Sequence, residues 1–213
     1  MSTPSPSARD TVFVAGRHHI ETASGRYVDL LNPGPATITL QDIAHHLAQA
    51  NRYAGAARRP LSVAEHTLLV ADRLWSQGHA ARTILLGLHH DDAEAYAQDL
   101  TRPLKLALDD YPPIERALGD AVRVALSLPA SEDGDGEAIR AADDWALAAE
   151  AYFLLPSRGE GWFCWGLYDP LDGRNPRASY GLATGDPPRW ETLRDAWLDR
   201  HDYWLRAMER ASA

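Results

Sequence analysis

Residues 84–96 read ILLGLHHDDAEAY, and in this stretch an apolar helix pattern runs directly into a row of histidines and acids. Ile84, Leu85 and Leu88 recur at the spacing of one helix face, which predicts a helix from about Ala80 to Ala97. The apolar face of such a helix packs into a core, and its polar positions remain available for chemistry. We therefore expect both the fold and the function to centre on this segment.

Three polar residues of the segment fall on one arc of the predicted helix. At about 100° per residue, His90, Asp91 and Glu94 span an arc of about 100° and can face a common point. Imidazole and carboxylate groups are metal ligands, and a second carboxylate beside them can move protons. Gly87 lies one turn earlier on that face, where its missing side chain is expected to leave room for an ion or a phosphate. A His-Asp pair alone does not identify a metal site, so further ligands are required.

The flanking sequence predicts an all-α chain with one short hairpin. The runs TVFVAG and RYVDLL predict a hairpin between Thr11 and Leu31. Ser62 and Glu65 form a capping-box pattern, in which the serine caps one backbone amide and the glutamate reaches back to another. The predicted helices span about 40–50, from residue 62 onward, 80–97, 112–128, 138–155 and 190–210.

Length and composition favour one globular domain. The chain has 213 residues, of which 45% are hydrophobic and 24% are charged, and this mix is typical of a protein with a buried core. We expect a flexible tail over residues 1–10 and a single domain over 11–213. Within that domain an irregular Trp-rich segment is expected near 157–189, before the C-terminal helix.

Charge, cysteine content and hydropathy exclude several classes of function. The net charge of −9 opposes binding to nucleic acid through its phosphates. Cys164 is the only cysteine, so neither an intrachain disulfide nor a cysteine-based metal cluster can form. No apolar run reaches the roughly 18 residues that a membrane span requires, and no hydrophobic export segment stands at the start. We therefore expect a cytoplasmic protein, and any phosphate ligand that it binds must be small.

Two further residues of ligand type lie inside apolar helix patterns. His66 follows Val63 and Ala64 and would alone be interpreted as a hydrogen-bonded core histidine. Asp143, in IRAADDWALAAE, would alone be interpreted as a favourable acid near a helix start. Only together with the His-Asp pair at 90–91 do these two residues indicate a metal site.

The order His66, His90-Asp91, Asp143 resembles that of the ligands in the HD-domain metal-dependent phosphohydrolase superfamily. Five blocks resemble its nucleotide-hydrolysing branch, which includes bacterial 5′-deoxynucleotidases and phage deoxynucleoside triphosphohydrolases. The blocks are GRYVDLLNP, DIAHHLAQANRY, SVAEH, HDDAEAYAQDLTRPLK and IRAADDWALAAE, within about 22–155. The resemblance implies an HD-domain helical bundle and a homodimer.

The resemblance also implies a site with a single divalent ion. His66, His90, Asp91 and Asp143 would bind this ion, and Mn²⁺, Co²⁺, Fe²⁺, Ni²⁺, Zn²⁺ and Mg²⁺ remain open as its identity. Asp91 and Glu94 would be the catalytic residues, with Glu94 moving protons at the attacking water or at the leaving group. No histidine lies between Asp91 and Asp143, whereas two-metal members recruit two there. The resemblance therefore points away from cyclic-dinucleotide phosphodiesterases and di-iron oxygenases.

Five substrate contacts follow from the same resemblance. Arg52 resembles a phosphate-binding arginine, Tyr53 would offer an aromatic face to the base, and Asp99 would bind a sugar hydroxyl. Arg102 and Lys105 are candidate contacts for further phosphates. The ordinary alternatives are a solvated surface arginine and an aspartate that ends a helix.

Three functions from different classes remain open. The leading hypothesis is a nucleotidase that releases inorganic phosphate from (deoxy)nucleoside 5′-monophosphates. The second is a deoxynucleoside triphosphohydrolase that releases triphosphate, favoured by the basic residues Arg58, Arg59, Arg102 and Lys105. The third is a catalytically silent binding module with the same fold, which the complete ligand set and Glu94 disfavour.

Overall fold

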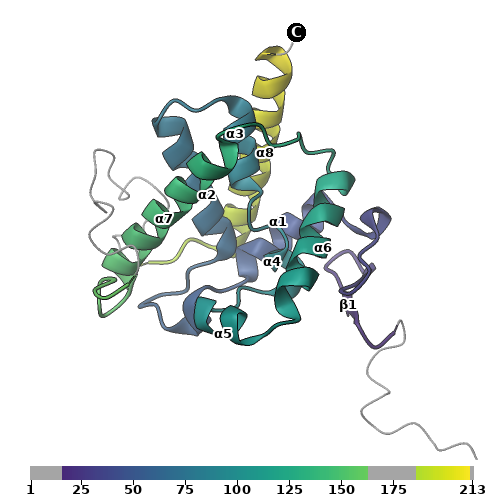
Figure 1. The fold of residues 1–213 in the computed structure, drawn as a ribbon, viewed down its shortest axis with the longest axis horizontal. Coiled ribbons are helices and arrows are strands. Elements are labelled where there is room, and N and C mark those ends of the chain that lie inside the picture. Colours follow the sequence, from purple (N-terminus) through teal and green to yellow (C-terminus); the bar gives the residue numbers. More distant parts are fainter. Residues whose placement is uncertain (1–15, 163–185, 212–213) are drawn as a thin grey trace, which may run out of the picture.

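The computed structural model describes residues 16–162 and 186–211, which form a helical body with a short hairpin at its edge (Figure 1). In chain order the elements are β1 (His19–Glu21), β2 (Tyr27–Asp29), the 3-10 turn η1 (Pro35–Thr37), α1 (Leu40–Gln49), the 3-10 turn η2 (Tyr53–Gly55), α2 (Val63–Ser76), α3 (Ala81–Leu88), α4 (Glu94–Ala97), α5 (Arg102–Ala107), α6 (Tyr111–Ala125), α7 (Asp135–Leu154) and α8 (Trp190–Ala211). The predicted all-α class with a short N-terminal hairpin is confirmed, but the first strand of the hairpin is His19–Glu21 and not the run TVFVAG, whose residues 11–15 lie outside the described residues. The predicted tail over 1–10, and residues 163–185 of the predicted Trp-rich segment, lie outside the described residues.

Most predicted helices agree with the structure to within one turn at each end, but α5 was not predicted. Its leucines explain why, because Leu104 and Leu106 are both exposed and give the segment no apolar stripe. None of the helices in the described ranges has the length and apolarity to cross a bilayer.

The capping-box prediction at the start of α2 is half right. Ser62 Oγ accepts a hydrogen bond from the backbone N–H of Glu65 at 3.1 Å, as an N-cap should. The Glu65 carboxylate does not reach back, because it accepts two hydrogen bonds from the Arg59 guanidinium at 2.9 and 2.5 Å. Arg59 is therefore buried in an ion pair and does not contribute a free charge to the loop before α2.

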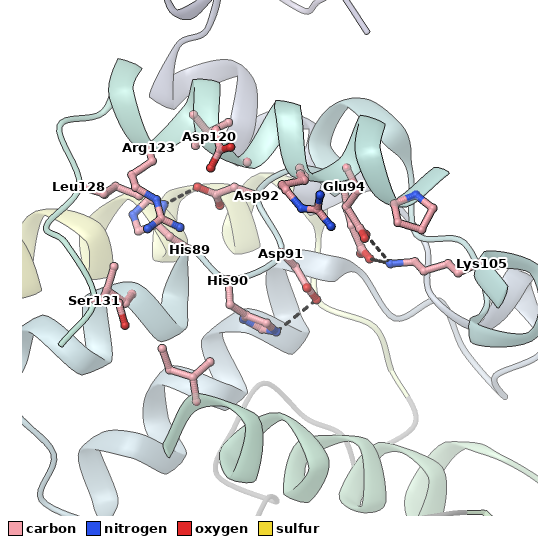
Figure 2. Close-up of a pocket in the computed structure, with 18 residues that line it drawn as sticks. His89, His90, Asp91, Asp92, Glu94, Lys105, Asp120, Arg123, Leu128 and Ser131 are labelled. Carbon is pink, nitrogen blue, oxygen red and sulfur yellow. Dashed lines mark hydrogen bonds and ion pairs between the residues drawn. The ribbon is translucent and has the colours of Figure 1, made fainter. Parts of the chain in front are cut away.

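The helix predicted over 80–97 breaks at the histidines, so that prediction is wrong in its middle. After α3 ends at Leu88, residues 89–93 form a turn (Figure 2). Two of its backbone hydrogen bonds, from Glu94 N–H to Asp91 O and from Ala95 N–H to Asp92 O, join residues three apart. Such bonds wind the chain more tightly than an α-helix does. The His-Asp pair at 90–91 therefore lies on a tight turn between two helices.

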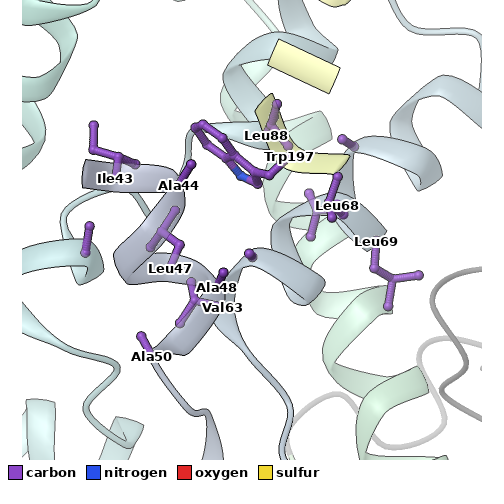
Figure 3. Close-up of a cluster of buried hydrophobic side chains, with 14 of the residues drawn as sticks. Ile43, Ala44, Leu47, Ala48, Ala50, Val63, Leu68, Leu69, Leu88 and Trp197 are labelled. Atoms are coloured by element: carbon purple, nitrogen blue, oxygen red, sulfur yellow. The ribbon is translucent and has the colours of Figure 1, made fainter. Parts of the chain in front are cut away.

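The core forms around α2, which packs against α1, α3 and α7, while α8 packs across α1 and α3. Figure 3 shows Leu47, Leu68 and Leu88 in this cluster beside Trp197 of α8. Trp197 is fully buried, and its indole N–H donates to Thr67 Oγ1 at 3.1 Å. Because neighbouring helices surround α2, even its polar residue His66 is completely buried. The core thus holds the first candidate ligand in a fixed position.

Gly87 serves helix packing and does not leave room for an ion, contrary to the prediction. A Cβ at this position would lie 2.3 Å from Leu74 Cδ1. Leu74 belongs to α2 and is fully buried. The missing side chain therefore allows α3 to approach α2 closely, which also brings the following turn close to His66.

We expect Gly87→Ala to lower the free energy of unfolding by about 1 kcal/mol, because overpacking against Leu74 outweighs the gain in helix propensity. Gly119→Ala in α6 is the control, since a Cβ there meets no atom within 4 Å. The control should raise stability by about 0.5–1 kcal/mol. Urea denaturation measures the free energy of unfolding of both variants. Shifts of the same sign in the two variants would contradict the packing role of Gly87.

Candidate metal centre

Three side chains, from α2 and from the turn after α3, bring their ligand atoms close together. His66 Nε2 lies 3.4 Å from His90 Nε2 and 3.5 Å from Asp91 Oδ2. His90 Nε2 lies 3.3 Å from the same Asp91 oxygen. Ligands around a four-coordinate ion with bonds of about 2.0–2.2 Å are themselves about 3.3–3.6 Å apart. The spacing of the three atoms therefore matches that of ligands around one ion.

Asp143 of α7 adjoins this group at the same nitrogen of His66. Its Oδ1 lies 3.0 Å from His66 Nε2 and 3.9 Å from His90 Nε2. The set whose ligand atoms all lie within 4.8 Å of one another is His66, His90 and Asp91. The structure thus brings three of the four predicted ligands together, and Asp143 lies outside this group but next to His66.

The two imidazoles are oriented by hydrogen bonds on their other nitrogens. His66 Nδ1 donates to Glu150 Oε1 at 2.6 Å, and His90 Nδ1 donates to the carbonyl oxygen of Gly87 at 2.8 Å. A carbonyl or carboxylate accepts at Nδ1, so each ring directs Nε2 toward the shared point. This arrangement is typical of metal-binding histidines, and it shows that the donor set fits a divalent ion.

Glu150 is a buried residue of the site that the sequence analysis missed. Its second oxygen accepts a hydrogen bond from the Tyr53 hydroxyl at 2.5 Å and lies 3.3 Å from Arg52 Nε. Burial acts to raise the pKa of Glu150, but Arg52 and His66 outweigh it and hold that pKa below its usual range. The signal was available, since Glu150 follows Asp143 by two helical turns in an otherwise apolar stretch.

The charge on His66 depends on these same neighbours. Burial and the Arg52 guanidinium act to lower the pKa of His66. Glu150 and Asp143 outweigh both and raise the pKa of this imidazole to about 10. Without metal, the site therefore holds a proton on His66 at neutral pH, and a bound cation would replace that proton.

Arg52 and Tyr53 lie beside the metal ligands on the loop between α1 and α2. Arg52 Nη1 lies 3.7 Å from Asp91 Oδ2, so its charge faces the centre. Tyr53 has φ +59°, a left-handed conformation that non-glycine residues rarely adopt. Its ring lies 5.9 Å from that of Trp162. Tyr53 therefore has two roles, because its hydroxyl anchors Glu150 while its ring lines the space outside.

A cavity of about 650 Å³ opens onto this centre, a size that fits a small-molecule ligand. All five predicted substrate contacts line it, together with three of the predicted metal-binding and catalytic residues. These residues are Arg52, Tyr53, Asp99, Arg102, Lys105, Asp91, Glu94 and Asp143. Ala56, Leu147, Leu155 and Trp162 supply an apolar portion of the wall.

Glu94 is buried at the edge of the cavity with one oxygen available for chemistry. Its Oε1 accepts a hydrogen bond from Lys105 Nζ at 2.8 Å, whereas its Oε2 has no hydrogen-bond partner in the described part of the chain. Burial, reinforced by the Asp91 charge, raises the pKa of Glu94 to about 8. Lys105 also pairs with Glu115 at 2.7 Å, so its ammonium group already has two partners. A carboxyl group with this pKa can give or take a proton near neutral pH.

The raised pKa of His66, about 10, predicts that metal affinity increases with pH. Between pH 6 and 8.5 the apparent Co²⁺ affinity should rise about tenfold per pH unit for each proton that the ion displaces. Calorimetric titration across this range measures this affinity. In the metal-free protein the His66 contribution to stability should be present below pH 6.5 and be lost as the pH rises through about 10. A pH-independent affinity would contradict this assignment.

Comparison with known proteins places the chain in a family. No protein-family model matches it. It is 36% identical over 112 residues to the uncharacterized protein YfdR of Escherichia coli, covering 52% of this chain and 59% of that protein. It is 35% identical over 193 residues to the uncharacterized protein RCAP_rcc00048 of Rhodobacter capsulatus, covering 87% of this chain and 94% of the relative. At that identity and coverage, the chain belongs to the same family as the Rhodobacter capsulatus protein.

Proposed function

We propose that this protein is a metal-dependent phosphohydrolase of the HD-domain type that acts on nucleotides and releases phosphate from (deoxy)nucleoside 5′-monophosphates. The observation that carries the proposal is the pair of imidazoles, His66 and His90, held with Nε2 toward Asp91 by hydrogen bonds on their far nitrogens. The cavity beside them is lined by the guanidinium of Arg52, by the carboxyl group of Glu94 and by aromatic rings. These groups suit the phosphate, the proton transfer and the base of a nucleotide, respectively.

His66, His90, Asp91 and Asp143 would hold one divalent ion. When bound, such an ion polarises a phosphoryl oxygen and lowers the pKa of a bound water. Nitrogen and oxygen donors without thiolates suit Mn²⁺, Co²⁺, Fe²⁺, Ni²⁺ and Zn²⁺, and Mg²⁺ remains open.

The chain's own residues bind and orient the substrate around this centre. Arg52 faces Asp91 and is positioned to pair with a phosphate oxygen. Glu94 can hold a proton on Oε2 and deliver it to the leaving oxygen, or accept one from the attacking water. Tyr53 and Trp162 form an aromatic wall on which a base can stack.

Ion pairs at two of the basic residues favour a monophosphate over a triphosphate substrate. Of the four basic residues that favour a triphosphate, Arg59 is paired with Glu65, and Lys105 is paired with Glu94 and Glu115. Their charges are therefore committed within the protein, and binding a longer phosphate chain would require breaking these pairs.

Product analysis tests the reaction. With Mn²⁺ or Co²⁺ added, a panel of nucleoside mono- and triphosphates should give inorganic phosphate from the monophosphates, and a chelator should abolish the activity. Nucleoside plus tripolyphosphate from triphosphates would instead support the triphosphohydrolase. No turnover of either class by protein shown to contain metal would support the silent binding module.

Substitutions separate metal binding from proton transfer. We expect Glu94→Gln to keep the metal and to lower kcat by about 10²–10⁴-fold, because it removes only the proton-transfer group. His66→Ala and Asp143→Ala should lose the metal, as measured by metal analysis after gel filtration. Equal metal loss in all three variants would contradict this division of roles.

A further inference from the structure

The outer pair of the HHDD stretch closes the turn that carries the inner pair. His89 Nδ1 and Asp92 Oδ2 are joined by a hydrogen bond of 2.6 Å across the turn, and both side chains are buried. Figure 2 shows this bond, with His90 and Asp91 directed to the other side of the turn. The two metal-ligand candidates are therefore bracketed by a hydrogen-bonded pair that does not take part in the ligand cluster.

The same pair is anchored to the C-terminal helix. His89 Nε2 lies 2.8 Å from His201 Nδ1 of α8. This distance is that of a hydrogen bond between the two rings, and which nitrogen donates depends on their tautomers. The His201 ring stacks on Trp197 at an interplanar angle of 9°, and Trp197 meets His89 edge to face at 4.9 Å. The turn is thus held from α8 by one hydrogen bond and by aromatic contacts.

Trp197 also contacts the other ligand-bearing segment. Its indole N–H donates to Thr67 Oγ1 at 3.1 Å, and Thr67 directly follows His66 in α2. One buried side chain of α8 therefore touches both His89, the neighbour of His90, and Thr67, the neighbour of His66. This arrangement fixes the position of the turn relative to α2, and with it the distance between the two imidazoles.

Stability alone does not explain a buried Asp-His-His arrangement in this position. Burying polar groups costs free energy that their hydrogen bonds only partly recover, and an apolar set of similar volume is often at least as stable. Metal binding requires more exact positions than stability does, since a bound ion tolerates displacements of only about 0.5 Å in its ligands. A turn joined by bonds between residues three apart needs such support more than a regular helix does.

We propose that His201 and Trp197 of α8, with His89 and Asp92, form a positioning network for the metal centre. These residues touch neither the ion nor the substrate, and they set the affinity and the ligand geometry of the site by fixing the turn against α2. The inference rests on the metal centre of the proposed function and is independent of whether nucleotides are hydrolysed.

The test compares Co²⁺ binding by the full chain and its His201 variants. His201→Phe keeps a ring against Trp197 but removes the hydrogen-bond partner of His89, whereas His201→Asn restores a side chain that can donate or accept near the position of Nδ1. We expect His201→Phe to weaken Co²⁺ binding about 10–100-fold and to change the visible absorption bands of the bound ion. His201→Asn should recover most of the affinity and the wild-type spectrum.

Leu193→Ala is the matched control, because Leu193 is also a buried residue of α8. It should lower the free energy of unfolding and leave the Co²⁺ affinity and spectrum unchanged. Wild-type affinity and spectrum in His201→Phe, or an equal loss of affinity in Leu193→Ala, would overturn the proposal.

A second pair of variants tests the positioning network if His201→Phe does not fold. Asp92→Asn keeps an oxygen acceptor for His89 Nδ1–H and should retain the Co²⁺ affinity. Asp92→Ala should bind Co²⁺ about 10–100-fold more weakly. Equal affinities in the two variants would contradict the network. Wild-type protein that binds Co²⁺ but hydrolyses no nucleotide would contradict only the proposed function.

Discussion

Two hydrogen bonds, from His66 Nδ1 to Glu150 and from His90 Nδ1 to the Gly87 carbonyl, hold the candidate centre in its orientation. With the far nitrogens engaged, each Nε2 has only the shared point to face. The helices contribute by placing the acceptors, since Glu150 is buried on α7 and the Gly87 carbonyl lies at the end of α3. The site is therefore a consequence of how α2, α3 and α7 pack.

Arg52 places a positive charge at the cavity of an acidic protein. The chain carries a net charge of −9, yet Arg52 is buried between Asp91 and Glu150 and faces the cavity. Its charge helps to keep Glu150 ionised, and Glu150 in turn orients His66. Glu94 also lines the cavity, and burial there favours its neutral form. The cavity thus presents the Arg52 charge together with a protonatable carboxyl group, while the ionised Glu150 lies buried behind Arg52.

Apolar periodicity predicted the helical class, whereas the residues that meet at the site were predicted from their order along the chain, which resembles that of the HD-domain ligands. It did not predict the break after Leu88, since the tight turn depends on the His89–Asp92 bond and on α8, which is distant in sequence. Glu150 was missed because its role arises only when α7 packs beside α2. Gly87 was misinterpreted for the same reason, as its neighbour Leu74 is a tertiary contact.

The most direct test of the account is anomalous diffraction from crystals of the protein loaded with Co²⁺. The account predicts one Co²⁺ per chain with Nε2 of His66 and His90 at about 2.0–2.2 Å, and with a carboxylate oxygen of Asp91 in the same coordination sphere. Co²⁺ bound without either imidazole, or no ordered ion at this position at saturating concentration, would contradict it.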